Sequence, residues 1–262
     1  MNVLIVGKGG YIGERLAAFL KGNKIFSVHV ADSYDEWKSH NFENYCAVIF
    51  AAGIAHRKQK KSNRNEYFAV NRDLAVAVAE KAKNAGVAQF VYLSSLAVYG
   101  KKEGEINAHT KPNPRHNDYY GTSKFHAENM LKNLQNDAFK VAIVRPPMVY
   151  GPDCPGKYRT LEKFAKFFPL VPNNRNKRSI IYIDNLCAFL CALILLRSEG
   201  EFCPQNNEYA NTAELIKKIR AESGKKTRLF NARPLISALS VLPVVKTAFG
   251  TLYYSGTEGE EK

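Results

Sequence analysis

The chain has 262 residues, 45% of them hydrophobic, which is enough for one large domain, or for a domain and a smaller lobe, around a buried core. The formal net charge is +14. The basic run over residues 56–64 nevertheless lacks the interleaved aromatic residues with which proteins stack on the bases of single-stranded nucleic acids, so we expect no nucleic-acid partner. Five scattered cysteines without a CxxC pair exclude a disulfide framework and a zinc site, and we expect no metal.

The longest apolar stretches, residues 186–196 and 234–245, argue against membrane insertion. The first is shorter than the roughly 20 residues of a spanning helix, and Pro243 interrupts the second. No secretory signal opens the sequence, so a cytoplasmic protein is expected.

The first predicted element is a buried strand over residues 2–6, with the sequence NVLIV. A glycine-rich loop, GKGGYIG, follows at once and leads into the helical pattern ERLAAFLKG. A strand, a glycine loop and a helix in this order bind the pyrophosphate of a dinucleotide, as in a Rossmann site, because the helix N-terminus offers free N–H groups. The residues expected to contact the cofactor here are Gly7, Gly10, Tyr11, Ile12 and Gly13.

The second predicted strand, SVHVAD, ends at Asp32. A carboxylate at this place can accept hydrogen bonds from both adenosine ribose hydroxyls, and it would repel the 2′-phosphate of NADP. The sequence therefore favours NAD over NADP. Asp32 could equally be a turn residue before the segment SYDEW.

The third predicted strand, CAVIFAAG, ends in small residues that leave room for a cofactor: Ala51, Ala52 and Gly53. A long helical pattern follows over residues 66–86, and Gly86 is placed to end it. Asn71 lies on the apolar part of this helix. A polar residue there is unusual unless it has partners.

The next predicted strand begins the phrase QFVYLSSLAVYG and ends at Ser94 and Ser95. The helix YYGTSKFHAEN then carries Tyr120 and Lys124 at i and i+4, which places them on one helical face. Tyr119 points about 100° away around the helix. Taken alone, the tyrosine and the lysine could simply be two stacked side chains.

The glycine spacing, the serine phrase before VYG and the tyrosine–lysine pair together resemble the extended short-chain dehydrogenase/reductase superfamily, in particular its NAD-dependent epimerase/dehydratase family. The resemblance implies an α/β, Rossmann-type doubly wound parallel sheet with a small C-terminal substrate lobe. It also implies a catalytic site made of Ser95, Tyr120 and Lys124. By the same resemblance, Asn71 helps shape the active site and cofactor pocket.

The chemistry of such a site explains these residue types. Oxidation of a sugar hydroxyl needs a base, and tyrosine is a poor one at its usual pKa of about 10. The ammonium of Lys124, with oxidised nicotinamide, would lower the pKa of Tyr120, while its other donors hold the nicotinamide ribose. Ser95 would orient the substrate oxygen.

Two later segments carry expected contacts. In KVAIVRPPMVYGP, the resemblance places Pro147 against the nicotinamide and Met148 at the substrate, where many UDP-hexose 4-epimerases have asparagine. In RSIIYIDN, Arg178 resembles the arginine that clamps the diphosphate of a sugar nucleotide, a task that suits a planar guanidinium. Arg178 could instead be one more surface cation.

The dehydratases of the family follow the catalytic hydroxyl with Asp-Glu, but here Leu96 and Ala97 stand there and cannot exchange protons. Two activities remain. The first is NAD-dependent 4-epimerisation of a UDP-hexose or UDP-N-acetylhexosamine, and the second is NAD(P)H-dependent reduction of a 4-keto-6-deoxy nucleotide sugar. Both fit the polysaccharide-biosynthesis branch of the family. A dinucleotide sensor without turnover is a third hypothesis, which the complete serine–tyrosine–lysine set disfavours.

The expected division is a dinucleotide-binding domain over residues 1–150, to which residues 180–200 return, and a substrate lobe from residues 151–179 and 201–254. Residues 255–262 are expected to form a frayed tail. The expected partners are a nucleotide-diphosphate sugar and a second copy of the chain, since relatives commonly dimerise through the helix that carries Tyr120.

Overall fold

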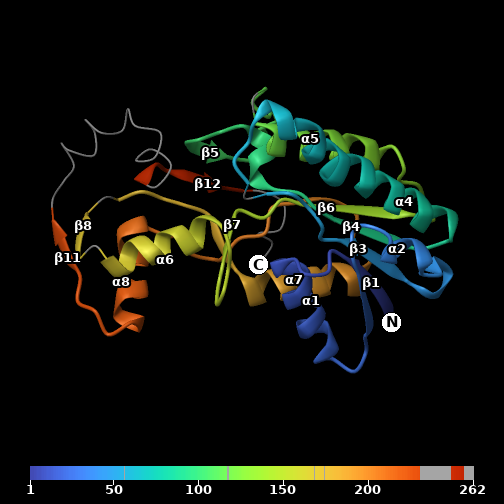
Figure 1. Cartoon of the computed structure of the whole chain (residues 1–262), viewed down its shortest axis with the longest axis horizontal. Helices are drawn as coiled ribbons and strands as arrows, with labels where there is room; N and C mark the ends of the chain where they lie inside the picture. The colour runs from blue at the N-terminus through green and yellow to red at the C-terminus, as the bar shows by residue number, and fades with distance from the viewer. Residues whose placement is uncertain (56, 117, 168, 174, 231–248, 257–262) are drawn as a thin grey trace.

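The computed structural model describes residues 1–55, 57–116, 118–167, 169–173, 175–230 and 249–256. At its centre is a six-stranded parallel sheet with the strand order β10-β6-β4-β3-β1-β2 (Figure 1). This confirms the predicted Rossmann-type α/β fold. The strands of the sheet are β1 (Asn2–Val6), β2 (Ser27–Ala31), β3 (Ala47–Phe50), β4 (Gln89–Leu93), β6 (Lys140–Val144) and β10 (Gly200–Phe202).

Helices cover both faces of the sheet (Figure 1). The helices α1 (Tyr11–Lys21) and α7 (Ile183–Leu196) lie on one face, and α4 (Ala75–Asn84) and α5 (Tyr119–Lys132) lie on the other. Because side chains alternate along a strand, Val3 and Ile5 pack under α1 and α7, while Leu4 and Val6 pack under α4 and α5. Burial on both faces is why the first strand is apolar throughout.

The helix predicted over residues 66–86 has three parts. It begins as α3 (Arg64–Phe68), widens into a π-helical turn (Ala69–Leu74) and continues as α4. Asn71 lies in the π-helical turn and is fully buried. Single π turns of this kind occur frequently at functional sites.

Short elements complete the sheet region. Between β2 and β3 the chain forms only α2 (Glu36–Ser39) and a 3-10 turn (Phe42–Asn44), so β2 is the edge strand. A 3-10 turn (Lys61–Asn63) precedes α3, and another (Leu96–Tyr99) follows β4.

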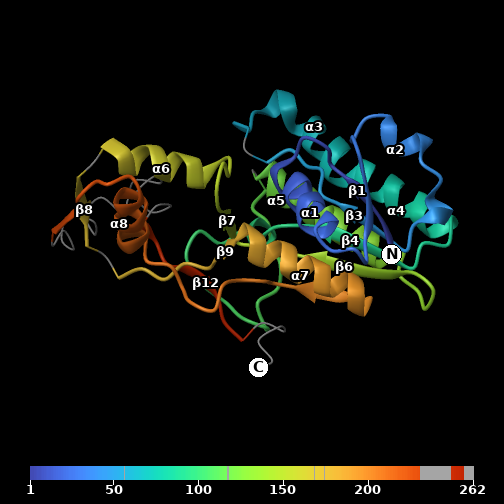
Figure 2. The same ribbon diagram turned by 90° about the horizontal axis from the view of Figure 1, so that it is seen from below.

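A smaller group of elements lies beside the sheet region in both views (Figures 1 and 2). Helices α6 (Lys157–Phe167) and α8 (Thr212–Glu222) pack around an apolar cluster that includes Ala165, Val171 and Ile216. Two parallel strand pairs border it: β7 (Met148–Tyr150) with β9 (Ile180–Tyr182), and β8 (Leu170–Pro172) with β11 (Arg228–Phe230). A third pair, β5 (Gly104–Ile106) with β12 (Leu252–Tyr254), packs in a separate apolar cluster with Val98 and Tyr99.

The pairing of two strands differs from the expected division. β10 extends the main sheet beside β6, although residues 201 and 202 were expected in the lobe. β12 pairs with β5, which belongs to the first 150 residues. The apolar residues 234–245 and the tail residues 257–262 lie outside the described residues. In the described part of the chain, no helix has the length and apolarity needed to span a bilayer.

Candidate active site

The carboxyl edge of the sheet brings together the loops that follow β1, β3, β4 and β6. The chain passes from β1 to β2 on one side and then returns to β3 on the other, so the order of the strands reverses beside β1. Ligands of open α/β sheets bind in the crevice at such a reversal. The backbone N–H groups of Ala51 and Ala52 donate to Val6 O at 2.9 and 3.0 Å, which holds the end of β3 against the end of β1.

The glycine loop makes two close approaches that exclude a side chain. Gly7 has φ +144°, and a Cβ there would lie 2.8 Å from Ala52 N. A Cβ on Gly13 would lie 2.9 Å from Gly7 O, so α1 packs directly on the loop. The N–H groups in the first turn of α1 have no intrahelical acceptor. The loop residues therefore fit the pyrophosphate of a dinucleotide.

Asp32 follows β2 and forms a tight turn. Its Oδ1 accepts hydrogen bonds from the backbone N–H groups of Tyr34, Asp35 and Glu36, at 2.9, 3.1 and 3.2 Å. These bonds, the one from Tyr34 first, hold the pKa of the Asp32 carboxyl below its usual value. Among the described residues, every hydrogen bond that this carboxylate accepts ends at Oδ1, so the turn does not use Oδ2.

Ser95 and Tyr120 meet in the structure. Ser95 follows β4 in an extended conformation, with φ −165° and ψ 153°, and Tyr120 is the second residue of α5. Burial raises the pKa of Tyr120, and the nearby Ser95 hydroxyl opposes that rise. The Ser95 Oγ also accepts a hydrogen bond from Ala97 N at 3.2 Å. The serine and the tyrosine that the sequence singled out are thus brought together.

Lys124 is buried one turn along α5, with an exposed fraction of 3%. Its Nζ donates to Leu93 O at 2.8 Å and lies 4.6 Å from the centroid of the Tyr92 ring. Burial lowers the pKa of Lys124 to about 7, against the opposing effect of Glu128. A Cβ on Gly53 would lie 3.2 Å from this Nζ, so a side chain there would crowd the lysine.

Burial is the largest influence on the pKa of Tyr120. The expected lowering of this pKa by the Lys124 ammonium together with oxidised nicotinamide stays a prediction. The hydrogen bond to Leu93 O holds the ammonium at the end of β4.

Asn71 joins two parts of the site. Its Oδ1 accepts from Ile54 N at 2.8 Å, and its Nδ2 donates to Ile54 O at 3.1 Å and to Ser123 Oγ at 3.0 Å. Tyr92 donates its hydroxyl to the Asn71 backbone carbonyl at 2.6 Å. The amide therefore fastens the segment after β3 to α5, and its polar atoms are occupied by protein.

Of the three later candidates, Pro147 and Met148 follow β6, and Arg178 lies just before β9. Pro147 is buried, and Met148 opens β7 half-buried. Arg178 is also half-buried, and its Nη1 donates to Gly250 O at 2.9 Å. Burial lowers the pKa of Arg178. This hydrogen-bonded position differs from that of a solvated surface cation.

One contact at the site was not predicted. Gln59, in the basic run, accepts a hydrogen bond from Tyr119 N at 2.6 Å and donates to Asp118 Oδ1 at 3.0 Å. Asp118 in turn caps α5 by accepting from Gly121 N. Gln59 thus fixes the basic loop on the N-terminal end of the helix that carries Tyr120. A single glutamine among lysines carries no sequence signal for this role.

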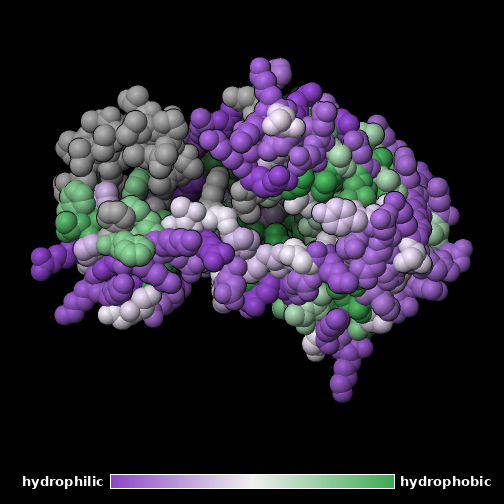
Figure 3. Space-filling model, viewed as in Figure 1, coloured by the Kyte–Doolittle hydropathy of each residue, from purple (hydrophilic) through white to green (hydrophobic). Residues whose placement is uncertain are grey.

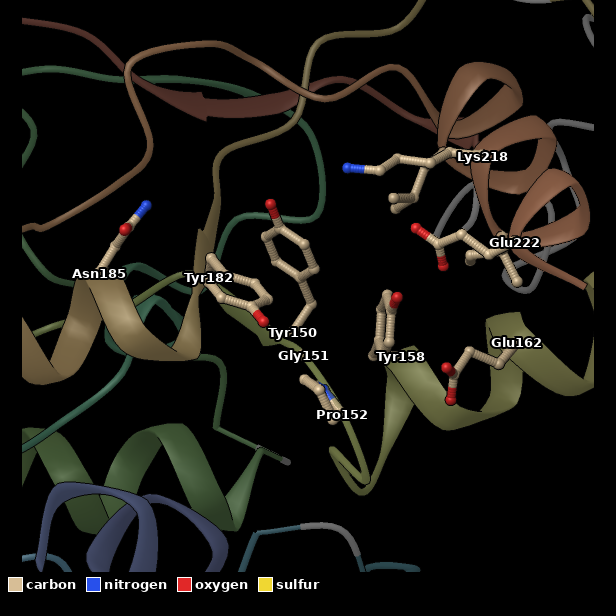
Figure 4. A pocket seen from close by; sticks show the side chains of 11 residues that line it. Tyr150, Gly151, Pro152, Tyr158, Glu162, Tyr182, Asn185, Lys218 and Glu222 are labelled. Carbon is tan, nitrogen blue, oxygen red and sulfur yellow. The ribbon is translucent and has the colours of Figure 1, made fainter. Parts of the chain in front are cut away.

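A separate cavity of about 490 Å³ lies between the β7–β9 pair and the helices α6 and α8 (Figure 4). Figure 4 shows tyrosine rings and charged side chains around it: Tyr150, Tyr158, Tyr182, Glu162, Lys218 and Glu222. Hydrophilic residues cover most of the face shown in Figure 3, in keeping with the charge of the chain. The sequence offered no prediction for this cavity.

Comparison with known proteins adds a family match. The model of the NAD dependent epimerase/dehydratase family matches residues 3–202. A UDP-glucose 4-epimerase of Vibrio cholerae is 28% identical over 254 residues, which cover 86% of this chain and 77% of the relative. The N-acetyl-alpha-D-glucosaminyl-diphospho-ditrans,octacis-undecaprenol 4-epimerase of Escherichia coli O157:H7 is 26% identical over 220 residues, or 72% of this chain and 62% of the relative.

Solved structures share the fold at lower identity. The UDP-glucuronic acid 4-epimerase of Bacillus cereus in complex with NAD has a TM-score of 0.75 at 18% identity, over 97% of this chain and 88% of the other. A dTDP-4-dehydrorhamnose reductase of Clostridium acetobutylicum has a TM-score of 0.73 at 21% identity, over 88% of this chain and 83% of the other.

Proposed function

This chain belongs to the NAD dependent epimerase/dehydratase family, and we propose that within it the protein is a nucleotide-sugar 4-epimerase acting on a UDP-hexose or UDP-N-acetylhexosamine. The family and the matched relatives are enzymes, epimerases and reductases that use NAD or NADP. The observation that carries the proposal is the placement of the Ser95 hydroxyl beside Tyr120, close enough to oppose the rise that burial causes in the pKa of Tyr120, with buried Lys124 one helical turn away. The 4-epimerase names of the matched curated relatives support the choice of reaction.

In this proposal Tyr120 accepts the proton of the C4 hydroxyl and later returns it. The Ser95 hydroxyl, which lies beside Tyr120, orients the substrate oxygen. Lys124 has a pKa of about 7, so near neutral pH a large fraction of it carries the positive charge that favours tyrosinate. When bound, NAD supplies the acceptor, and then the donor, of the hydride at C4.

The cofactor would lie along the carboxyl edge of the sheet. We assign its pyrophosphate to the glycine loop, its adenosine ribose to Asp32 Oδ2, and its nicotinamide end to the walls formed after β3 and β6. Asn71 shapes this wall without contacting the cofactor by hydrogen bonds, since its amide is occupied. The proposed cofactor residues are Gly7, Gly10, Tyr11, Ile12, Gly13, Asp32, Ala51, Ala52, Gly53, Asn71, Tyr120, Lys124 and Pro147.

The sugar nucleotide would extend from Ser95 past Met148 toward Arg178. A guanidinium can bind diphosphate oxygens in pairs, and the half-buried setting of Arg178 strengthens such a contact by reducing solvent screening. A homodimer through the face of α5 is part of the same proposal.

A one-way reductase of a 4-keto-6-deoxy nucleotide sugar is the second candidate. The observation that favours it is Met148, whose thioether cannot donate a hydrogen bond to the diphosphate of a UDP-hexose. Both reactions use the same proton transfer at Tyr120, so they differ only in whether the hydride returns.

Incubation with a panel of sugars separates these candidates. Purified protein without added cofactor should convert a UDP-hexose or UDP-N-acetylhexosamine into its C4 epimer, measured by chromatography, because an epimerase regenerates its bound NAD at each turnover. The panel should include dTDP-sugars and N-acetylglucosaminyl-diphospho-undecaprenol, the substrate named for one relative. If no epimer forms with any sugar, but NAD(P)H is oxidised when a 4-keto-6-deoxy sugar is added, the reductase replaces the epimerase.

Asp32→Asn separates the ribose contact from the turn. The asparagine oxygen can still accept the three backbone N–H bonds, so the turn should persist. The lost charge should weaken NAD binding by roughly tenfold, because a charge-assisted hydrogen bond contributes about 1.4 kcal/mol. It should also reduce the preference for NAD over NADP. Calorimetric titration with each cofactor measures both effects.

The neighbouring Asp35→Asn is the matched control, since Asp35 is exposed and pairs with Lys38. It should leave both affinities unchanged. Unaltered NAD affinity in Asp32→Asn would mean that Asp32 serves the turn alone.

A further inference from the structure

A buried ion pair lies beside the proposed catalytic residues without being part of them. Arg145, directly after β6, contacts Glu128 of α5 through two parallel hydrogen bonds: Nη2 to Oε2 at 2.7 Å and Nε to Oε1 at 3.0 Å. The side chains are 2% and 0% exposed. Burial of two charges carries a large desolvation cost, so an ion pair at this depth calls for a role beyond stability.

The pair also controls the strand end that carries the serines. Ser94 donates its hydroxyl to Glu128 Oε1, and its backbone N–H donates to Val144 O at 2.7 Å. Both contacts fix Ser94 toward the interior of the protein. Ser95, the next residue, is thereby presented to Tyr120.

Glu128 lies one helical turn beyond Lys124, on the same face of α5, as Lys124 lies one turn beyond Tyr120. The titratable groups that face Lys124 are Tyr120 and Glu128 from α5 and Tyr92 from β4, while Arg145 approaches Glu128 from the end of β6. Of these groups, Glu128 is the one that raises the pKa of Lys124 against the effect of burial.

Arg145 is itself held from two sides. Its Nη1 contacts Glu201 of β10 at 2.7 Å and the Tyr99 hydroxyl at 3.0 Å. Glu201 is partly exposed, whereas Glu128 is completely buried. The guanidinium thus cannot turn away, and the Glu128 carboxylate stays oriented in the plane that the two bonds define.

From this geometry we propose that Glu128, oriented by Arg145 and Ser94, is a positioning residue whose buried carboxylate, one helical turn from Lys124 and beyond ion-pair distance, favours the charged form of Lys124. This role rests on the proposed function, because it matters for turnover only if Lys124 assists Tyr120. Glu128 does not touch substrate or cofactor. It keeps the lysine charged in a setting that would otherwise discharge it.

The test measures the charge of Lys124 directly. Lysine labelled with ¹³C at Cε gives an NMR signal whose shift follows protonation, and the signal of Lys124 is the one absent from Lys124→Met. In Glu128→Gln, which is nearly isosteric and uncharged, the titration midpoint of Lys124 should fall by about one pH unit. The pH at which turnover declines on the alkaline side of its pH profile should fall by the same amount.

Glu201→Gln is the matched control. It removes the other carboxylate on Arg145 but leaves Glu128 in place, so the midpoint of Lys124 should stay where it is in the unaltered protein. Glu128→Asp keeps the charge at a shorter reach, and its midpoint should lie between those of the unaltered protein and Glu128→Gln.

Each outcome decides the proposal. An unshifted midpoint in folded Glu128→Gln overturns it, and so does a shifted midpoint with an unchanged turnover profile. If Glu128→Gln does not fold, Glu128→Asp decides, since a midpoint equal to that of the unaltered protein overturns this role of Glu128. Because the NMR titration needs no substrate, a shifted midpoint with no turnover of any sugar would refute the proposed function and leave the electrostatic pairing intact.

Discussion

Tyr120→Phe is expected to lower turnover by roughly 10²- to 10⁴-fold, the range typical for loss of a positioned acid–base group. Phenylalanine keeps the ring of Tyr120 in its half-buried place but cannot accept or return a proton. The change should cost little stability, because Ser95 is only half-buried and keeps the hydrogen bond from Ala97 N. Turnover of the sugar identified by the panel, with NAD affinity from calorimetry, measures the effect.

NAD affinity should change by no more than a few-fold in Tyr120→Phe, so that the loss falls on turnover. Tyr119→Phe is the matched control, because Tyr119 meets Gln59 through its backbone N–H and lies about 100° away around the helix. It should retain most of the activity. Full activity in Tyr120→Phe, or an equal loss in Tyr119→Phe, would falsify the assignment of the proton transfer to Tyr120.

Lys124→Met is expected to lower turnover by about 10²-fold or more and to move the remaining activity to higher pH. Methionine fills most of the buried space between Gly53 and Tyr92 but brings no charge. Without the ammonium the positive charge expected to favour tyrosinate is lost, and only Ser95 opposes the raised pKa of Tyr120, so tyrosinate should form in more alkaline solution. Turnover measured across the pH range, with the thermal midpoint as a check on folding, tests this expectation.

The control for this substitution is Lys132→Met on the same helix, since Lys132 is partly exposed and pairs with Glu201. Surface ion pairs contribute little, so its turnover and pH profile should match those of the unaltered protein. A Lys124→Met variant with the original pH profile would show that the lysine charge plays no part in the proton transfer.

The strands and helices at the carboxyl edge were predictable because their signals are local. The apolar run of β1, the glycine spacing after it and the i, i+4 relation on α5 each lie within a dozen residues. These features owe nothing to distant parts of the chain.

The state of the charges was not predictable in this way. Lys124 and Glu128 look from the sequence like ordinary members of a polar helix, and Arg145 like a residue of a turn before two prolines. Their burial depends on β4, β6 and α5 packing together from segments far apart in the chain. Gln59 is similar, because its contact with the start of α5 needs a loop about 60 residues upstream to fold across it.

The sequence by itself determined the fold class, and it predicts the dinucleotide loop and the choice of Tyr120 over Tyr119, because helical phase and loop geometry are short-range properties of the chain. Only the tertiary structure decided how that tyrosine and its lysine are charged. Burial raises the pKa of Tyr120 and lowers that of Lys124, while the carboxylate of Glu128 opposes the second shift. Desolvation and ion pairing arise from packing, so no local pattern of residues encodes them.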